Sequence, residues 1–336
     1  MLPKPMPWGP ERLRQVSSAY WESCALHVMV QTGLAAALVQ GPATAPDLAQ
    51  RLGLDQRGLA VLLRALSVLE LVSEVDEQFV LNPAVVPHLT PGDQRDMSDA
   101  ILHMADMVDD WSHLAECVRS GQPVKDPGWE MPGPNPRREH FYRAMRDIAR
   151  QQAAGLSGRL GLLPGQRLID LGGGPGVYGL TFAEEVPGLM VTVFDLPRAR
   201  EHFLAESELH PGATQAVFQE GNFLQDDLGG PYDVAWLSQI LHSEGPEACS
   251  DLLARAVAAL KPGGQLWVQE FAVDIPGPAW PGLFGLNMLV NTRQGMAYSR
   301  QELIYMLVTA GLRQVRYAGQ TREGAAAALL WGQKPE

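Results

Sequence analysis

The hydrophobic positions of the chain follow two different periods, and the change comes near residue 167. Before it, apolar residues such as Leu59, Leu63 and Leu66 recur at the three- and four-residue spacing of amphipathic helices. After it, short apolar runs such as RLIDL and YDVAWLSQIL alternate with helical segments. This alternation predicts a parallel sheet with helices on both faces. The sequence therefore predicts a helical N-terminal part and an α/β C-terminal part.

Residues 44–82 have the pattern of two helices followed by a hairpin. Thr44, with Asp47 three residues later, is typical of a helix start, and Gly53 separates this helix from the next. The stretch 71–82 alternates around an acidic tip and predicts the hairpin. Two helices and a hairpin form a winged-helix pattern.

Three more segments have helical periodicity. Residues 18–38 and 98–120 each predict one long helix, and residues 138–156 predict another, with Phe141 and Met145 on its apolar stripe. A Gly- and Pro-rich stretch precedes the last of these helices. We therefore predict a winged-helix-like domain over residues 1–120, a linker and connecting helix over 121–160, and a third domain over 161–336.

The charge of the chain argues against a nucleic-acid partner. The formal net charge is −12, and the first 100 residues contain seven Lys or Arg and eleven Asp or Glu. Because nucleic-acid binding depends on neutralising phosphates, a DNA-binding regulator is a poor interpretation of the winged-helix pattern. A scaffold that packs against itself or another subunit fits better.

Other classes are disfavoured by what the sequence lacks. The cysteines, Cys24, Cys117 and Cys249, are odd in number and far apart, so no disulfide framework or zinc knuckle is suggested. His103 and His113 share one segment without metal-ligand spacing, so no metal site is predicted. No apolar run approaches the roughly 20 residues of a membrane span, and the first 15 residues lack the apolar core of a signal peptide. We expect a cytoplasmic protein.

The first strand of the C-terminal part leads into a glycine-rich turn, LIDLGGGPGVYGL. Gly172 and Gly174 let the backbone turn tightly and approach a ligand. Val177 breaks the dinucleotide fingerprint, and the Lys-Ser/Thr pair of a phosphate-binding loop is missing. Asp170, inside the strand end, favours a ligand with an ammonium group over a pyrophosphate.

The second and third strands also end in polar residues. Asp195 lies 25 residues after Asp170, where a carboxylate can accept both hydroxyls of a ribose. Its alternative is an ordinary helix cap. Asn222 and Phe223 follow the third strand and are placed to hydrogen-bond and flank an adenine.

These motifs bring a known family into view. DLGGGPG, FDLP, GNFLQDDL, ILH and LKPGGQLWVQEF, together with HFYRAM, resemble the S-adenosylmethionine-dependent small-molecule O-methyltransferases of the caffeate and hydroxyindole type. The resemblance covers nearly the whole chain. It implies a Rossmann-like seven-stranded α/β domain with the last strand antiparallel, and an N-terminal, mostly helical winged-helix dimerisation domain. It also implies a homodimer.

The resemblance assigns cofactor contacts by position. Gly172 and Gly174 would line the methionine and ribose, Asp195 would hold the ribose, and Leu196 and Phe223 would flank the adenine. Asn222 stands where the family usually has Asp, and Ser238 stands where plant members have Lys.

His242 stands at the position of the family's general base, and histidine suits this role because its unperturbed pKa is about 6.5. The usual carboxylates beside it are missing, since Ser243 and Ala297 replace them. Glu270, at the end of a neighbouring strand, remains as a possible partner, and Glu244 is a substitute.

The expected substrate is a small, flat aromatic acceptor bound between the domains. Plain core packing is the alternative role for the methionines among the candidates, which are Met104, Met107, Phe141, Met145, Asn287, Met288 and Asn291. Because the support of His242 is reduced, a thiol, amine or carbon acceptor remains open. So does a protein that binds S-adenosylmethionine without methylating.

Overall fold

The computed structural model describes residues 7–124, 134–275, 280–321 and 327–336. The chain forms two compact units, Met1–Asp106 and Met107–Glu336, which are described separately. The predicted domain limits at residues 120 and 160 stay predictions.

The N-terminal unit is mostly helical. Its elements are α1 (Pro10–Ser18), α2 (Tyr20–Gln31), α3 (Leu34–Val39), α4 (Ala45–Leu52), α5 (Gln56–Val68), β1 (Val72–Val75), β2 (Gln78–Leu81), η1 (Val86–His88) and the start of α6 (Ser98–Trp111). Thr44 caps α4 by accepting a hydrogen bond from the Asp47 amide at 3.3 Å, as its position predicts. β1 and β2 pair as the predicted hairpin. A core of buried residues that includes Met29, Leu48 and Leu63 joins these helices to the hairpin.

Two of the predicted long helices are broken. The segment 18–38 ends α2 at Gln31 and begins α3 at Leu34, because Gly33 takes a left-handed conformation with φ 75°. The segment 98–120 is divided at Ser112 and His113, and the Ser112 hydroxyl donates to the Asp109 carbonyl at 2.6 Å. A serine that bonds to the backbone in this way competes with helix continuation.

The C-terminal unit is built on a seven-stranded sheet with the order β5-β4-β3-β6-β7-β9-β8. The strands are β3 (Arg167–Leu171), β4 (Met190–Asp195), β5 (Ala216–Glu220), β6 (Tyr232–Ser238), β7 (Leu260–Phe271), β8 (Arg313–Gln320) and β9 (Ala327–Gln333). The last strand, β9, is antiparallel to both of its neighbours, and the five strands before β8 are joined in parallel. The α/β fold with an antiparallel last strand is therefore confirmed.

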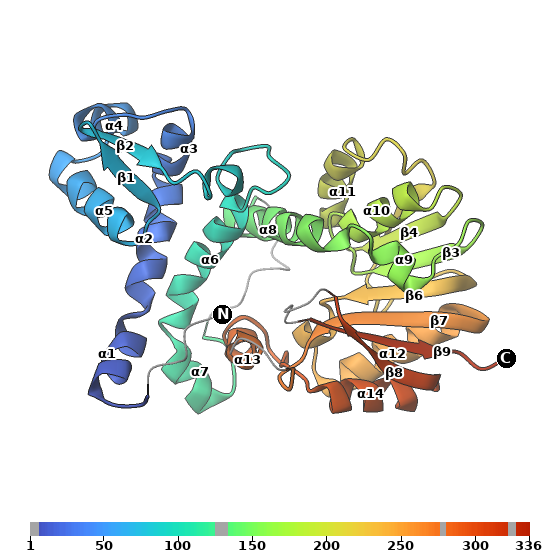
Figure 1. Cartoon of the computed structure of the whole chain (residues 1–336). Helices are drawn as coiled ribbons and strands as arrows, with labels where there is room; N and C mark the ends of the chain where they lie inside the picture. The colour runs from blue at the N-terminus through green and yellow to red at the C-terminus, as the bar shows by residue number, and fades with distance from the viewer. Residues whose placement is uncertain (1–6, 125–133, 276–279, 322–326) are drawn as a thin grey trace. The chain divides into compact units, whose positions relative to one another are not determined.

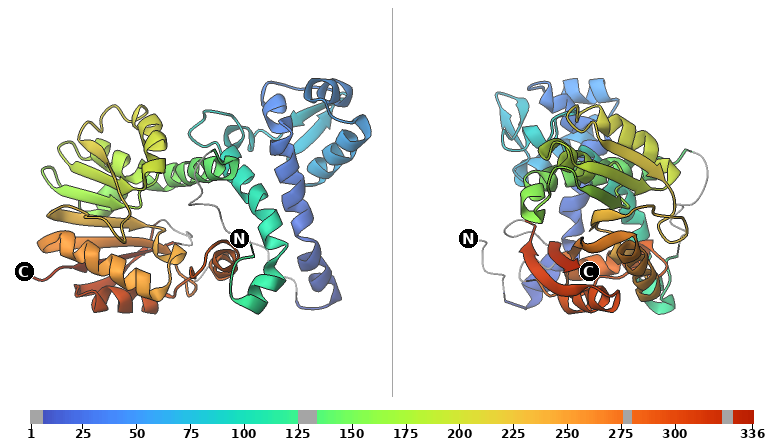
Figure 2. Two further views of the ribbon diagram at one scale, coloured as in Figure 1. Left: turned by 180° about the vertical axis from the view of Figure 1, so that it is seen from behind. Right: turned by 90° about the vertical axis from the view of Figure 1, so that its right-hand side faces the viewer.

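Helices cover both faces of this sheet (Figure 1). The helices of the C-terminal unit are α7 (Leu114–Ser120), α8 (Pro136–Ala153), α9 (Leu156–Leu160), α10 (Val177–Glu185), α11 (Arg200–Ser207), α12 (Pro246–Ala259), α13 (Trp280–Asn291) and α14 (Arg300–Thr309), with short 3₁₀ turns η2 (Pro197–Ala199) and η3 (Leu241–Ser243). The cluster with α9 and α10 packs on one face, and the cluster with α12 and α14 packs on the other. The same two layers flank the sheet when it is seen from behind (Figure 2).

Alternating side chains of each strand enter the two clusters. Along β3, Leu168 joins the cluster under α10, whereas Ile169 and Leu171 join the opposite one. Because β3, β4, β6 and β7 run parallel, their carboxyl ends lie along one edge of the sheet. The residues just beyond those ends are the candidates of the next section.

Candidate active site

Backbone hydrogen bonds hold the loops beyond the strand ends beside one another. The Gly172 amide donates to the Phe194 carbonyl at 2.8 Å, and the Gly221 amide donates to Asp195 at 2.9 Å. On the other side of the centre, the Gln239 amide donates to Gln269 at 2.8 Å. The polar residues predicted from the strand ends therefore share one edge of the sheet.

The turn after β3 needs its glycines for different reasons. A Cβ at Gly172 would lie 2.4 Å from the Ile240 side chain, and one at Gly173 would lie 2.8 Å from Asp170. Gly174 has φ 55°, and a Cβ there would meet no described atom within 4 Å. Gly173 is thus required by close packing, Gly172 also has a φ of 70° that favours glycine, and Gly174 faces open space.

Asp195 is fixed directly opposite this turn. Its Oδ2 accepts from the Gly174 amide at 2.7 Å, and its Oδ1 accepts from the Leu196 amide at 2.6 Å. Burial raises the pKa of this carboxyl, and the two backbone hydrogen bonds oppose that change. Each carboxylate oxygen keeps a further lone pair, so the group can accept two hydroxyl hydrogens of a ligand.

Asp170 is almost completely buried beneath the glycine turn. Its carboxylate is 1% exposed and accepts from the Gly179 amide of α10 at 3.1 Å. Burial raises its pKa to about 7. The side chain therefore supports the glycine turn from inside the layer between β3 and α10.

Asn222 and Phe223 open the loop between β5 and β6. The Asn222 side-chain oxygen accepts from the Leu224 backbone amide at 2.9 Å, and the Asn222 backbone amide donates to Asp226 Oδ2 at 2.7 Å. The Phe223 ring lies beside the glycine turn, 3.5 Å from the point where a Cβ of Gly172 would stand. The loop thus closes on itself and presents a half-buried ring to the turn.

A polar network lies behind the end of β6. The Tyr178 hydroxyl is hydrogen-bonded to Ser238 and accepts from Gln269 Nε2 at 2.9 Å. The same Gln269 nitrogen donates to Gln152 of α8 at 2.9 Å. Ser238 therefore belongs to a network that ties α8, α10 and the sheet together.

Gln239, the next residue, was not predicted as a site residue. Its backbone takes a left-handed conformation with φ 59°, which is unusual for a residue with a side chain. Its side-chain amide is buried, and within the described part of the chain neither of its polar atoms has a hydrogen-bond partner. An unsatisfied buried amide at a strand end makes Gln239 a candidate for a contact with a ligand or a water molecule.

His242 lies on η3, at the carboxyl end of β6, and is held by Glu270 of β7. His242 Nδ1 and Glu270 Oε1 are 2.7 Å apart, and the His242 amide donates to Glu270 Oε2 at 3.2 Å. Glu270 is fully buried. Because an ionised Glu270 can only accept, we assign the Nδ1 proton to this hydrogen bond, and Nε2 is then the ring nitrogen that can meet a ligand. The backbone carbonyl of Glu244 accepts from the Tyr298 hydroxyl at 2.8 Å, and the role of its side chain as a substitute partner stays a prediction.

The connection between α13 and α14 supports His242 from a further side. The Met296 amide donates to the His242 carbonyl at 2.9 Å. A Cβ at Gly295 would lie 2.6 Å from the same carbonyl. The His242 ring also packs edge-on against Phe284 of α13, with ring centres 4.8 Å apart. Neither Gly295 nor Met296 was expected from the sequence pattern.

Residues 111–313 match the O-methyltransferase domain family, and residues 15–85 match the O-methyltransferase dimerisation domain. The chain is 31% identical to 3-hydroxy-5-methyl-1-naphthoate 3-O-methyltransferase of Streptomyces sahachiroi, over 97% of this chain and 96% of the relative. The chain belongs to the O-methyltransferase family.

Two further comparisons agree with this assignment. Acetylserotonin O-methyltransferase of Bos taurus is 27% identical over 92% of this chain and 94% of its own. The structure of human N-acetylserotonin methyltransferase in complex with SAM shares the fold, with a TM-score of 0.84, 24% identity and full coverage of both chains. S-adenosylmethionine is the methyl donor of this O-methyltransferase.

The strand-end residues fit this cofactor. The Asp195 carboxylate suits ribose hydroxyls, the open face of Gly174 leaves room beside it, and the Phe223 ring is a surface for a flat base. The unsatisfied Gln239 amide adds a donor and an acceptor at the same edge. Asn222, Leu196 and Ser238 are half-buried, as lining residues are.

Three of the predicted acceptor contacts, Met107, Asn287 and Asn291, come together within the C-terminal unit. Asn287 Oδ1 accepts from Trp111 Nε1 and from Asn291 Nδ2, each at 2.9 Å. Asn291 Nδ2 also lies 3.9 Å from the Met107 sulfur, and Met288 is buried nearby on α13. Phe141 and Met145 are half-buried on α8, where the fully packed positions are their neighbours Tyr142 and Ala144. Met104 belongs to the N-terminal unit.

Two further findings concern metal sites and membrane-spanning helices in the described residues. Over residues 7–124, 134–275, 280–321 and 327–336, no three His, Cys, Asp or Glu side chains are grouped closely enough to hold a metal ion. Among these same described residues, no helix combines the length and the apolar character of a transmembrane segment.

Proposed function

We propose that this O-methyltransferase methylates a hydroxyl of a small, flat aromatic acceptor, with His242 as the general base and Glu270 as the residue that orients it. The 2.7 Å contact between His242 Nδ1 and Glu270 Oε1 is the observation that carries the proposal. It fixes the ring and leaves Nε2 as the proton acceptor. The similarity to a naphthoate 3-O-methyltransferase supports a fused aromatic substrate.

The proposed step is a displacement with a balanced proton transfer. When bound, S-adenosylmethionine supplies an electrophilic methyl group on a sulfonium, and S-adenosylhomocysteine is the product. His242 Nε2 takes the hydroxyl proton as the oxygen–methyl bond forms. Glu270 stabilises the imidazolium that results, because its buried carboxylate faces Nδ1. A positioned base of this kind contributes roughly a hundred- to ten-thousandfold to the rate.

Because carboxylates are missing beside His242, this base has less support than usual. The proposal therefore favours an acceptor whose hydroxyl is acidic. Ser243 uses its hydroxyl to donate to the Ile240 carbonyl at 2.7 Å, and Ala297 has no polar side chain. Glu270, whose Oε1 lies 2.7 Å from His242 Nδ1, is thus the acid that we propose as the partner of the ring. A phenol or enol with a low pKa needs less help from its base than an alcohol does.

The cofactor contacts follow from the strand-end geometry. In the proposal, Asp195 holds the ribose, Gly172 and Gly174 line the methionine and ribose, and Gln239 contacts the polar end of the cofactor. Leu196, Asn222 and Phe223 surround the adenine, and Ser238 borders it. Asp170 acts through the turn above it, since its carboxylate is buried against Gly179.

The acceptor contacts are proposed on α8, α13 and α6. Phe141, Met145, Met107 and Met288 offer apolar and polarizable surface to a flat ring. The hydrogen bonds of the asparagine pair leave Asn287 Nδ2 and Asn291 Oδ1 available to a polar substituent. Met104 lies in the N-terminal unit and stays a sequence-based prediction. We propose that this unit forms a homodimer, as its dimerisation-domain match suggests.

The experiment is release of S-adenosylhomocysteine from the full chain with matched acceptors. A naphthol, a simple phenol, an aryl thiol and an aryl amine of similar shape would be compared, and each product would be identified by mass spectrometry. We expect turnover of the naphthol, with the methyl group on oxygen. Turnover confined to the thiol or the amine would overturn the hydroxyl assignment. Binding of the cofactor without turnover of any acceptor would overturn the methyl-transfer proposal.

A further inference from the structure

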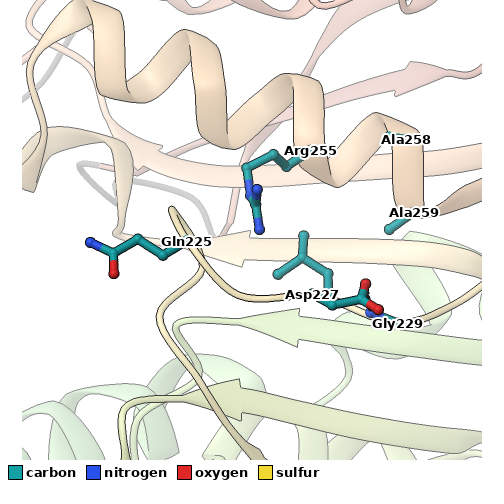
Figure 3. Close-up of a pocket in the computed structure, with 7 residues that line it drawn as sticks. Gln225, Asp227, Gly229, Arg255, Ala258 and Ala259 are labelled. Atoms are coloured by element: carbon teal, nitrogen blue, oxygen red, sulfur yellow. Dashed lines mark hydrogen bonds between the residues drawn. The ribbon is translucent and has the colours of Figure 1, made fainter.

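A hollow of about 460 Å³ lies between α12 and the loop from β5 to β6. Figure 3 shows the Arg255 side chain reaching from α12 toward this loop. The residues that line the hollow are Gln225, Asp227, Leu228, Gly229, Arg255, Ala258 and Ala259. Arg255 is the one cation among them.

Arg255 is bonded to the backbone of the loop. Its Nε donates to the Phe223 carbonyl at 2.8 Å, and a second guanidinium nitrogen donates to the Asp226 carbonyl. Within the described ranges of the chain, no carboxylate pairs with the Arg255 guanidinium. Its charge is therefore directed at two carbonyl oxygens, and charge-assisted hydrogen bonds are stronger than neutral ones.

These two bonds complete the fixation of the loop. The loop's own side chains satisfy its amides, because Asp226 accepts from the Asn222 amide and Asn222 accepts from the Leu224 amide. Arg255 satisfies carbonyls on the opposite side. Its helix is a firm support, since Leu252 and Ala256 on either side of it are fully buried in the core.

Phe223 links the hydrogen bonds of Arg255 to the glycine turn. Its carbonyl is held by Arg255, and its ring lies beside Gly172. A carbonyl fixed in this way restricts the backbone from which the ring projects. Lysine carries one donor group on a flexible stem, whereas the guanidinium offers two donors in a planar fork.

We propose that Arg255 is a positioning residue for the cofactor, which acts through Phe223 and sets the affinity for the adenine end. The inference rests on the proposed function, because it takes the Phe223 ring as the adenine contact. Arg255 touches neither cofactor nor acceptor in this account. Its loss should raise the dissociation constant of S-adenosylhomocysteine and the KM for S-adenosylmethionine, with little change of kcat at saturation.

The test is calorimetric binding of S-adenosylhomocysteine to the full chain and its variants. We expect Arg255→Met to raise the dissociation constant about tenfold, which corresponds to one lost charge-assisted hydrogen bond, and Arg255→Lys to raise it less. Arg200→Met is the matched control, since Arg200 forms an exposed pair with Glu220. Circular dichroism would check that each variant is folded. If Arg255→Met does not fold, the binding test is made with Arg255→Lys.

A double-mutant cycle separates this proposal from the one on which it rests. If Arg255 acts through Phe223, adding Arg255→Met to Phe223→Ala should weaken binding no further. If Phe223→Ala weakens binding and Arg255→Met does not, the adenine placement stands and the role of Arg255 is refuted. If Phe223→Ala leaves binding unchanged, the adenine placement fails and the inference falls with it. Additive effects would also overturn it.

Discussion

Glu270 accepts hydrogen bonds from both the backbone amide and the ring Nδ1 of His242, at 3.2 and 2.7 Å. One buried carboxylate thereby fixes the position of the residue and the orientation of its imidazole. The carbonyl of His242 is held separately, by the Met296 amide at 2.9 Å. The backbone amide, the backbone carbonyl and the ring Nδ1 of His242 are therefore all held by hydrogen bonds. These bonds fix the orientation of Nε2 without a second acid.

Gly295 should be sensitive to a single added methyl group. In Gly295→Ala the new Cβ would lie 2.6 Å from the His242 carbonyl and 2.4 Å from Thr292 Oγ1, so the η3 turn must shift. We expect kcat to fall about tenfold or more, because small misplacements of a base cost that much. Steady-state kinetics would measure it.

Gly282→Ala is the control for this change. Gly282 lies in α13, and a Cβ there would meet no described atom within 4 Å. We expect this variant to keep the wild-type rate and to gain up to about 1 kcal/mol in unfolding free energy. Equal rates for the two glycine variants would show that the position of the turn does not limit the reaction.

Asp195→Asn should weaken binding of the cofactor more than it lowers the stability of the fold. The substitution replaces one acceptor oxygen by a donor, which then faces the amide of Gly174 or Leu196 and cannot accept a ribose hydroxyl. We expect the dissociation constant of S-adenosylhomocysteine to rise at least about tenfold. Isothermal calorimetry would measure it, with the exposed Asp251→Asn as control. Unchanged affinity would place the ribose elsewhere.

Asp170 should make stability depend on pH. Burial raises its pKa from 3.8 to about 7, so the folded chain keeps a proton that the unfolded chain releases near pH 4. The unfolding free energy of the wild type, taken relative to Asp170→Asn, should therefore fall as pH rises from about 4 to about 7. The slope should be at most about 1.4 kcal/mol per pH unit, and the difference should be constant above pH 7.

Urea unfolding of both chains at pH 5, 6, 7 and 8 would measure this difference. A difference that stays constant between pH 5 and 7, or that grows in favour of the wild type, would contradict the buried, protonated carboxyl. Asparagine preserves the acceptor for the Gly179 amide, so the comparison isolates the ionisation.

The strands were predictable because each is a short apolar run between polar or glycine residues. The helix breaks were not, because the periodicity continues across them. Met29 of α2 and Leu34 of α3 are both fully buried in one core, although Gly33 turns the chain between them. A turn that keeps the same side inward leaves no trace in the hydrophobic pattern.

The site was predictable where it depends on sheet topology alone. His242 follows β6 and Glu270 lies near the end of β7, the parallel strand beside it, so their proximity was expected from the order of elements. Asp170 shows the limit of that reasoning, since it shares a strand face with Leu168 and so points under α10. The contacts of Gly295 and Arg255 depend on how distant loops settle on the sheet, which no local pattern encodes.

The most direct test of the account is the pH dependence of a single turnover in wild type and His242→Ala. The substrate would be a phenol that the wild type methylates, with the cofactor saturating, between pH 6 and 9. We expect the variant to be at least about a hundredfold slower at pH 7, and to recover as the phenol ionises by itself. Wild-type and variant rates that agree across this range would contradict the role of His242 as the base.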